Sequence, residues 1–342
     1  MTAHELAETA QALVAEGKGI LAADESTGTI KKRFDSIGVE STEENRRAYR
    51  ELLFTTPGAN AFISGVILYD ETIRQQSAEG TPLAELLADQ GVIPGIKVDT
   101  GAKPLAGAPG EKITEGLDGL RERCAEYYAL GARFAKWRAV ITIGDGIPSD
   151  YCIDANAHAL ARYAALAQEA GLVPIVEPEV MMDGDHGIER CAEATEAALN
   201  ALYRELHAQR VVLEGSLLKV NMVLPGVGHA AQASVAEVAE ATVAVLRRCV
   251  PAAVPGIVFL SGGQSDTVAT AHLNAMNAMD ATQPWQLSFS YGRALQAPTL
   301  KAWAGKAENT AAAKDALYRR ARLNGAARFG RYSAEMEREA AA

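Results

Sequence analysis

The chain has 342 residues, is 48% hydrophobic and 22% charged, and carries a formal net charge of -10. This acidic balance excludes nucleic-acid grooves and membrane surfaces that depend on bulk positive charge, so we expect neither partner. It leaves room for small anionic substrates, which need only a few local basic groups. No apolar stretch reaches the ~20 residues of a membrane span, and no signal or transit peptide is visible. The four cysteines are scattered without a CxxC pair, which predicts a cytoplasmic protein with free thiols and no zinc site.

Short apolar runs alternate with amphipathic stretches along the whole chain. The strands are predicted to begin near residues 20, 63, 94, 132, 173, 217, 256 and 285. Helical patterns cover 2–16, 30–34, 42–54, 82–89, 117–130, 155–170, 189–209, 235–249, 267–279 and 294–325.

Eight strand–helix units predict a single (β/α)8 TIM barrel of class α/β over residues 1–330, followed by a polar tail over 331–342. The Gly- and Pro-rich stretch 101–116 is predicted to be a loop. A doubly wound open sheet is the alternative, but no GxGxxG motif follows the first strand.

Lys219 lies in the middle of the apolar strand predicted over 217–223. Side chains alternate along a strand, so Lys219 and Asn221 share one face. An ammonium group is costly to remove from water at such a position. The lysine therefore either forms a structural ion pair or acts as an amine nucleophile that forms a Schiff base with a carbonyl substrate. The local sequence leaves both interpretations open.

Other predicted strands also carry charged residues, which would converge on one pocket if the barrel closes. Such convergence favours a catalytic site over separate salt bridges at the rim. A free lysine has a pKa of ~10.4, and lowering it by ~3 units requires ~4 kcal/mol, to which a second ammonium could contribute by repulsion. Carboxylic acids nearby could move protons. The charged strand residues are Asp24, Lys97, Lys136, Arg138, Glu177, Glu179, Lys219 and Arg293.

Two groups of residues are suited to bind anions. One is the turn Ser261-Gly262-Gly263 with Arg293, and the other is Ser26 and Thr29 with Lys97. A Ser/Thr/Gly turn between a strand and a helix can hold a phosphate with hydroxyls and backbone N–H groups, although the same residues also serve as ordinary helix caps. Two such groups fit a substrate with two phosphates better than one with a single phosphate.

Seven segments resemble the class I, Schiff-base fructose-1,6-bisphosphate aldolases. They occur in family order over about residues 15–305, and the match is specific. The matching segments are GILAADESTG (19–28), GIKVD (95–99), FAKWR (134–138), VEPE (176–179), LLK (217–219), FLSGGQS (259–265) and SYGRALQ (290–296).

The resemblance implies reversible cleavage of fructose 1,6-bisphosphate by a (β/α)8 lyase without a metal or cofactor, commonly as a tetramer. Lys219 would form the Schiff base, Glu177 would dehydrate the carbinolamine, and Asp24 would take the proton of the C4 hydroxyl. Lys136 and Glu179 would support this chemistry electrostatically, and Arg138 belongs with the substrate-binding residues. The C1 phosphate would bind to the Ser261-Gly262-Gly263 turn with Arg293. The C6 phosphate would bind to Ser26, Thr29 and Lys97.

The chain departs from the family pattern at two places. Val220 follows the lysine where many relatives have proline, and we expect no mechanistic effect. Well-known relatives end in a tyrosine that assists proton transfer, whereas the last tyrosine here is Tyr332. Tyr332 is either a substitute for it or a surface residue.

Three other functions fit the sequence less well than this one. A metal-dependent class II aldolase is disfavoured because the six histidines show no HxH or HExxH spacing, and Asp183-Gly184-Asp185-His186 is the one metal-like cluster. A transaldolase would need one phosphate site, and two are visible. A non-enzymatic scaffold role would be additional, because the nucleophile, the acids and the bases are all present.

Overall fold

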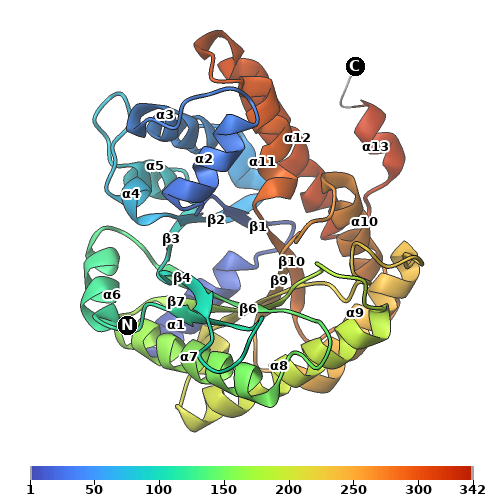
Figure 1. Ribbon diagram of the computed structural model, residues 1–342. Helices are drawn as coiled ribbons and strands as arrows, with labels where there is room; N and C mark the ends of the chain where they lie inside the picture. The colour runs from blue at the N-terminus through green and yellow to red at the C-terminus, as the bar shows by residue number, and fades with distance from the viewer. Residues whose placement is uncertain (1, 340–342) are drawn as a thin grey trace.

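A computed structural model describes residues 2–339 of the chain. Eight parallel strands form a closed barrel in the order β1-β10-β9-β8-β7-β6-β3-β2, and helices surround it (Figure 1). The predicted barrel is confirmed, and each predicted strand begins within two residues of the observed one. The barrel strands are β1 (Gly19–Ala22), β2 (Ile63–Leu68), β3 (Ile93–Lys97), β6 (Phe134–Ile141), β7 (Val173–Val180), β8 (Leu217–Val220), β9 (Gly256–Phe259) and β10 (Gln286–Tyr291).

The barrel strands run parallel because helical segments return the chain to the same end each time. The helices are α1 (Ala3–Leu13), α2 (Thr27–Asp35), α3 (Glu43–Phe54), α4 (Asp70–Ile73), α5 (Leu83–Asp89), α6 (Leu120–Ala129), α7 (Asp150–Glu169), α8 (Ile188–Ala208), α9 (Val235–Cys249), α10 (Asp266–Asn277), α11 (Arg293–Trp303), α12 (Thr310–Ala327) and α13 (Ala334–Glu339). Within residues 2–339, no helix combines the length and the apolar character that a membrane span requires.

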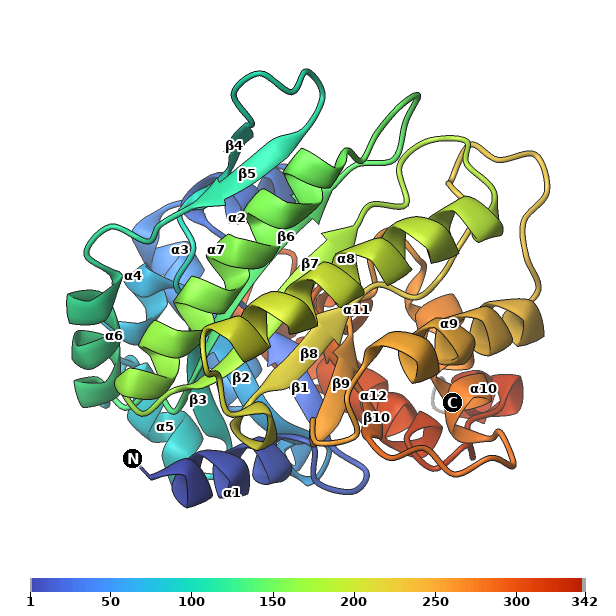
Figure 2. The same cartoon turned by 90° about the horizontal axis from the view of Figure 1, so that it is seen from below.

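Helix α1 closes the N-terminal end of the barrel. A capping box between Thr2 and Glu5 starts the helix, and Leu6, Ala10 and Leu13 form its buried face. This face packs against apolar side chains inside the barrel, including Ile175. Figure 2 shows α1 at one end of the barrel and a β-hairpin at the other. The apolar plug leaves the opposite end, where the strands finish, for polar side chains.

The stretch 101–116, predicted to be a loop, forms an antiparallel hairpin instead. Its strands are β4 (Gly101–Pro104) and β5 (Lys112–Glu115), and only the turn between them keeps the expected irregular backbone. Thr114 in β5 is buried, and its hydroxyl donates to the carbonyl of Arg138 at 2.7 Å. The hairpin is therefore held by the end of β6, a contact distant in sequence.

The helix predicted over 294–325 is two helices. Ala304 and Gly305 have φ angles of 48° and 73°, and this left-handed pair ends α11 before α12 begins. After α12, the described part of the polar tail forms α13. Glu337 of α13 lies 2.6 Å from the buried Arg320 of α12, and the Tyr332 hydroxyl donates to Glu337 at 3.0 Å.

Candidate active site

A cavity of about 540 Å³ opens at the C-terminal end of the barrel strands. Gly263 is not among its lining residues, because the N–H of Gly263 points to the sulfur of Met182 at 2.9 Å. The predicted site residues that line the cavity are Asp24, Ser26, Thr29, Lys97, Lys136, Arg138, Glu177, Glu179, Lys219, Ser261, Gly262 and Arg293.

The centre of the cavity contains two lysines that share a carboxylate. Lys219 on β8 is buried, and its Nζ lies 3.2 Å from Oε1 of Glu177 on β7. The other oxygen of Glu177 lies 3.5 Å from Nζ of Lys136 on β6. Asp24, directly beyond β1, lies 2.7 Å from Lys136. Four strands thus supply one compact cluster of two ammonium groups and two carboxylates.

The charges in this cluster stabilise one another. Burial opposes charge on Lys136, but the carboxylates of Asp24, Glu177 and Asp99 outweigh it and raise the pKa of Lys136 above its ordinary value. Burial likewise opposes ionisation of Asp24, but the ammonium groups of Lys136 and Lys219 hold the pKa of Asp24 well below its usual range. At neutral pH, Lys136 is therefore a cation and Asp24 is an ionised carboxylate.

Arg138 and Glu179 form an ion pair at the side of this cluster. The Nε of Arg138 on β6 donates to Oε2 of Glu179 on β7. Burial works against the charge of Arg138, but the Glu179 carboxylate prevails and raises its pKa. The ion pair therefore places a permanent guanidinium on the cavity wall.

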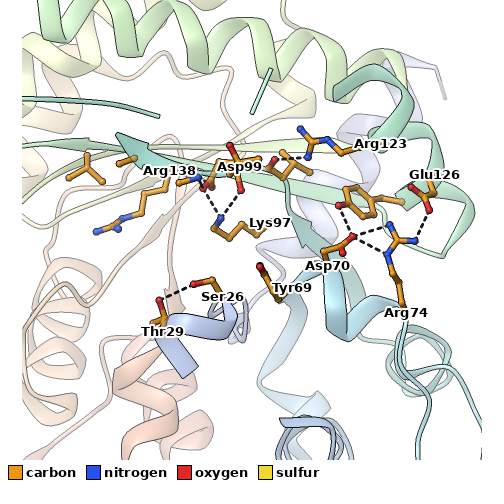
Figure 3. A pocket seen from close by; sticks show the side chains of 16 residues that line it. Ser26, Thr29, Tyr69, Asp70, Arg74, Lys97, Asp99, Arg123, Glu126 and Arg138 are labelled. Carbon is orange, nitrogen blue, oxygen red and sulfur yellow. Dashed lines mark hydrogen bonds and ion pairs between the residues drawn. The ribbon is translucent and has the colours of Figure 1, made fainter. Parts of the chain in front are cut away.

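Ser26 and Thr29 form a hydroxyl pair at the start of α2. Ser26 occupies the N-cap position but does not cap the helix, because its Oγ lies 3.1 Å from Oγ1 of Thr29. Both hydroxyls and Lys97 also line an adjoining cavity of about 560 Å³ (Figure 3). The site is therefore continuous with a second hollow beside Lys97.

Another part of the cavity wall is formed by the loop after β9 and the start of α11. Gly262 has a φ of 59°, a left-handed conformation that glycine adopts without strain. Burial lowers the pKa of Arg293, and the guanidinium of Arg33 lowers it further. Two guanidinium groups that repel each other would attract an anion between them.

Four functional candidates were missed by sequence reasoning. The buried Glu25 carboxylate pairs with Arg33 and with Arg50, the latter at 2.7 Å. Arg33 lies one helical turn beyond Thr29, so its spacing was a usable signal. Asp99 is two residues after Lys97, and this spacing places the two side chains on one face of an extended chain, so it was also a usable signal. Arg50 is on α3, and nothing in its local sequence indicates the contact.

The metal-like sequence 183–186 lies in the loop between β7 and α8. Backbone hydrogen bonds of 2.8 Å tie it to the loop after β8, from Gly226 N to His186 O and from Gly228 N to Gly184 O. Burial lowers the pKa of His186. Across residues 2–339, no group of three or more His, Cys, Asp or Glu side chains is arranged to hold a metal ion. The segment is thus a polar loop fastened to its neighbour.

This fold and site define a class of protein: a (β/α)8 barrel with a buried amine, neighbouring carboxylates and cationic walls, which can form an imine with an anionic carbonyl compound. Comparison with known proteins supports the same class. The model of the family "Fructose-bisphosphate aldolase class-I" matches residues 5–342. The chain belongs to this family.

Three relatives illustrate the similarity. A probable fructose-bisphosphate aldolase class 1 of Xanthomonas campestris is 63% identical, over 97% of this chain and 99% of its own. Fructose-bisphosphate aldolase 5, cytosolic, of Arabidopsis thaliana is 57% identical, over 99% of this chain and 95% of its own. A crystallised aldolase of Plasmodium falciparum, in complex with TRAP and an inhibitor, has a TM-score of 0.95 and 53% identity, over 97% of this chain and 96% of its own.

Family membership defines the reaction. The protein is a lyase that reversibly cleaves fructose 1,6-bisphosphate to dihydroxyacetone phosphate and glyceraldehyde 3-phosphate, a step of glycolysis and gluconeogenesis. Class I members use a lysine Schiff base and are metal-independent.

Proposed function

We propose that Lys219 is the amine that forms the Schiff base. The observation that carries this assignment is the different pairing of the three lysines in the cavity. Lys97 and Lys136 each have a carboxylate oxygen at 2.7 Å, whereas the carboxylate beside Lys219 is 3.2 Å away and is shared with Lys136. Lys219 is therefore the one of these three lysines that has no close carboxylate partner of its own.

In the proposed mechanism, the ammonium group of Lys219 passes a proton to Glu177, 3.2 Å away, and the resulting neutral amine attacks the C2 carbonyl of the substrate to give a carbinolamine. Glu177 donates a proton to the C2 hydroxyl, which leaves as water, and an iminium forms. Asp24 then accepts the proton of the C4 hydroxyl. The C3–C4 bond breaks, its electron pair moves into the iminium to give an enamine, and glyceraldehyde 3-phosphate leaves. Protonation at C3 and hydrolysis release dihydroxyacetone phosphate.

The remaining residues orient the two phosphates. Ser261, Gly262 and Arg293 would bind the C1 phosphate, with Gly263 shaping the turn. Arg33 joins this group because its guanidinium lines the same cavity.

At the other end, Ser26, Thr29 and Lys97 would bind the C6 phosphate. The permanent charges of Lys136 and Arg138 attract the bisphosphate as a whole, while Glu179 holds Arg138 in place. This arrangement separates the two phosphate groups on opposite sides of the amine.

We further propose that residues 1–330 form one catalytic barrel domain, that 331–342 are an appended tail, and that four copies assemble in the cytoplasm. Family resemblance supports the tetramer, and plant relatives are named cytosolic or cytoplasmic. Large apolar side chains on the surface, such as Tyr151 and Val227, are more than half exposed and are candidates for subunit contacts.

Reductive trapping tests the assignment of Lys219. Borohydride added with dihydroxyacetone phosphate, in excess EDTA, should reduce the imine to a stable secondary amine and inactivate the enzyme. Peptide mapping by mass spectrometry should place the adduct on Lys219. Lys219→Ala should abolish trapping and cleavage, whereas Lys136→Ala should slow turnover without moving the adduct. An adduct on Lys136 or Lys97, or activity lost to EDTA and restored by zinc, contradicts the proposal.

A further inference from the structure

Asp99 lies between two lysines to which the proposed function gives different roles: Lys97 binds the C6 phosphate, and Lys136 belongs to the central charge cluster. It lies two residues after the end of β3, and its side chain is 3% exposed. Its Oδ1 lies 2.7 Å from Nζ of Lys97 and accepts from Gly101 N at 3.2 Å. Its Oδ2 accepts from Arg138 N at 3.2 Å and lies 3.9 Å from Nζ of Lys136. Each carboxylate oxygen therefore faces one ammonium group and one backbone N–H (Figure 3 shows the Lys97 side).

The backbone around Asp99 is braced, so the carboxylate is the fixed partner. Arg123 donates to the carbonyls of Val98, at 2.8 Å, and of Gly116. Thr100 N donates to Glu115 O at 2.9 Å, which ties the segment to β5.

Lys97 is the partner that borders the cavities. Its side chain is 16% exposed, and its ammonium also donates a hydrogen bond to the carbonyl of Asp99 at 2.7 Å. It lines both the candidate active site and the adjoining cavity.

We propose that Asp99 is a positioning residue that couples binding of the C6 phosphate to the charge cluster around Lys136. The proposal rests on the proposed function and extends it. A phosphate dianion competes with Asp99 for the ammonium of Lys97. When the phosphate takes that ammonium, the carboxylate loses its nearest counter-charge and acts more strongly on Lys136, in a buried site with little screening.

Competition of this kind weakens binding of the phosphate and adds unbalanced negative charge beside the catalytic cluster. Lys136 is already a cation and lies 2.7 Å from Asp24, so the negative charge of Asp99 on its other side makes Asp24 a stronger base. Binding energy that is not realised when the substrate binds can be realised in the transition state, and it then raises kcat. A carboxylate that only anchored the hairpin would have no such effect.

Asp99→Asn tests the coupling because it keeps the shape of the side chain and removes its charge. Hexitol 1,6-bisphosphate has no carbonyl, so it binds without reacting, and calorimetry gives its Kd directly. We expect the variant to bind it about three- to tenfold more tightly, with little change for hexitol 1-phosphate, which has no C6 phosphate. We expect kcat for fructose 1,6-bisphosphate to fall at least about tenfold. Weaker or unchanged bisphosphate binding overturns the proposal, because lost support for the hairpin would give that result.

Two further variants distinguish competition for the ammonium of Lys97 from a general change in the electric field of the site. In a Lys97→Met background, Asp99→Asn should no longer tighten bisphosphate binding, and an equal gain in both backgrounds contradicts the proposal. Asp70→Asn is the matched control. Asp70 lines the adjoining cavity but accepts from Tyr127 at 2.9 Å and from Arg74 at 3.0 Å (Figure 3). It should change Kd by less than about twofold and leave kcat unchanged.

Reductive trapping keeps this test independent of the proposed function. The Asp99→Asn enzyme should still form its adduct on Lys219, and an adduct elsewhere in the native enzyme would refute the assignment of Lys219 and not the coupling. If Asp99→Asn does not fold, Asp99→Ser replaces it, because a serine hydroxyl can still accept from a backbone N–H. The same calorimetric outcomes then support or overturn the coupling.

Discussion

At the scale of single residues, Glu177 has an uncommon position between two ammonium groups, at 3.2 Å from Lys219 and 3.5 Å from Lys136. A carboxylate at this position can exchange a proton with the groups that react at Lys219, while the ammonium of Lys136 balances its negative charge. Asp24 adds the second negative charge, which balances the second ammonium group. The four side chains together therefore carry no net charge, and a proton can still be transferred among them.

Arg293→Ala should raise KM for fructose 1,6-bisphosphate by about tenfold to hundredfold, because a charge-assisted hydrogen bond to phosphate contributes ~1.5–3 kcal/mol. The effect on a ketose without phosphates should be small. Steady-state kinetics with both substrates measures the difference. Arg121→Ala is a suitable control, since Arg121 is an exposed partner of Glu169 on the outer surface. An unchanged KM in Arg293→Ala would show that this guanidinium does not contact the substrate phosphate.

At the scale of elements, the barrel interior depends on glycines within strands. A side chain at Gly65 or Gly95 would meet the ring of Phe134, and one at Gly19 would meet the ring of Phe289. Aromatic rings from one strand therefore fill the space that glycines leave on another. This packing brings the strands together below the cavity and sets the positions of Lys97 and Lys136, which pair across β3 and β6.

Gly95→Ala should destabilise the protein by about 1–3 kcal/mol, because the added methyl group overlaps Phe134 and a packed core relaxes only partly. The expected observation is a lower urea midpoint with an unchanged slope. Gly28→Ala is the matched control, since a Cβ at residue 28 meets nothing within 4 Å and the residue lies in α2. Equal midpoints for Gly95→Ala and the native protein would mean that the core tolerates the methyl group.

At the scale of the whole molecule, the proposed tetramer cannot be observed in the structure of a single chain. Light scattering should give a particle mass of about four times the chain mass of 36.2 kDa. Apolar surface residues such as Tyr151 and Val227 should become less accessible in the assembly. A mass equal to that of a single chain at micromolar concentration would rule out the tetramer.

Comparison of the predicted and observed elements shows where local patterns suffice. The helix predicted over 42–54 is confirmed as α3, and the side chain of Thr42 caps its start by accepting from Asn45 N at 3.1 Å. The hairpin at 101–116 was missed because Thr114 is held by a carbonyl of β6. The break after Trp303 was missed although Gly305, next to the left-handed Ala304, is a residue that typically ends helices.

The sequence by itself determined the eight-fold alternation, the class of reaction and most of the residues around the cavity, because strand periodicity and family motifs are local properties. Only the tertiary structure decided how those residues pair. It placed Asp99 between Lys97 and Lys136, and it brought Arg50 to Glu25. Charges interact through space over a few ångströms, so the pairing depends on which strands become neighbours when the barrel closes.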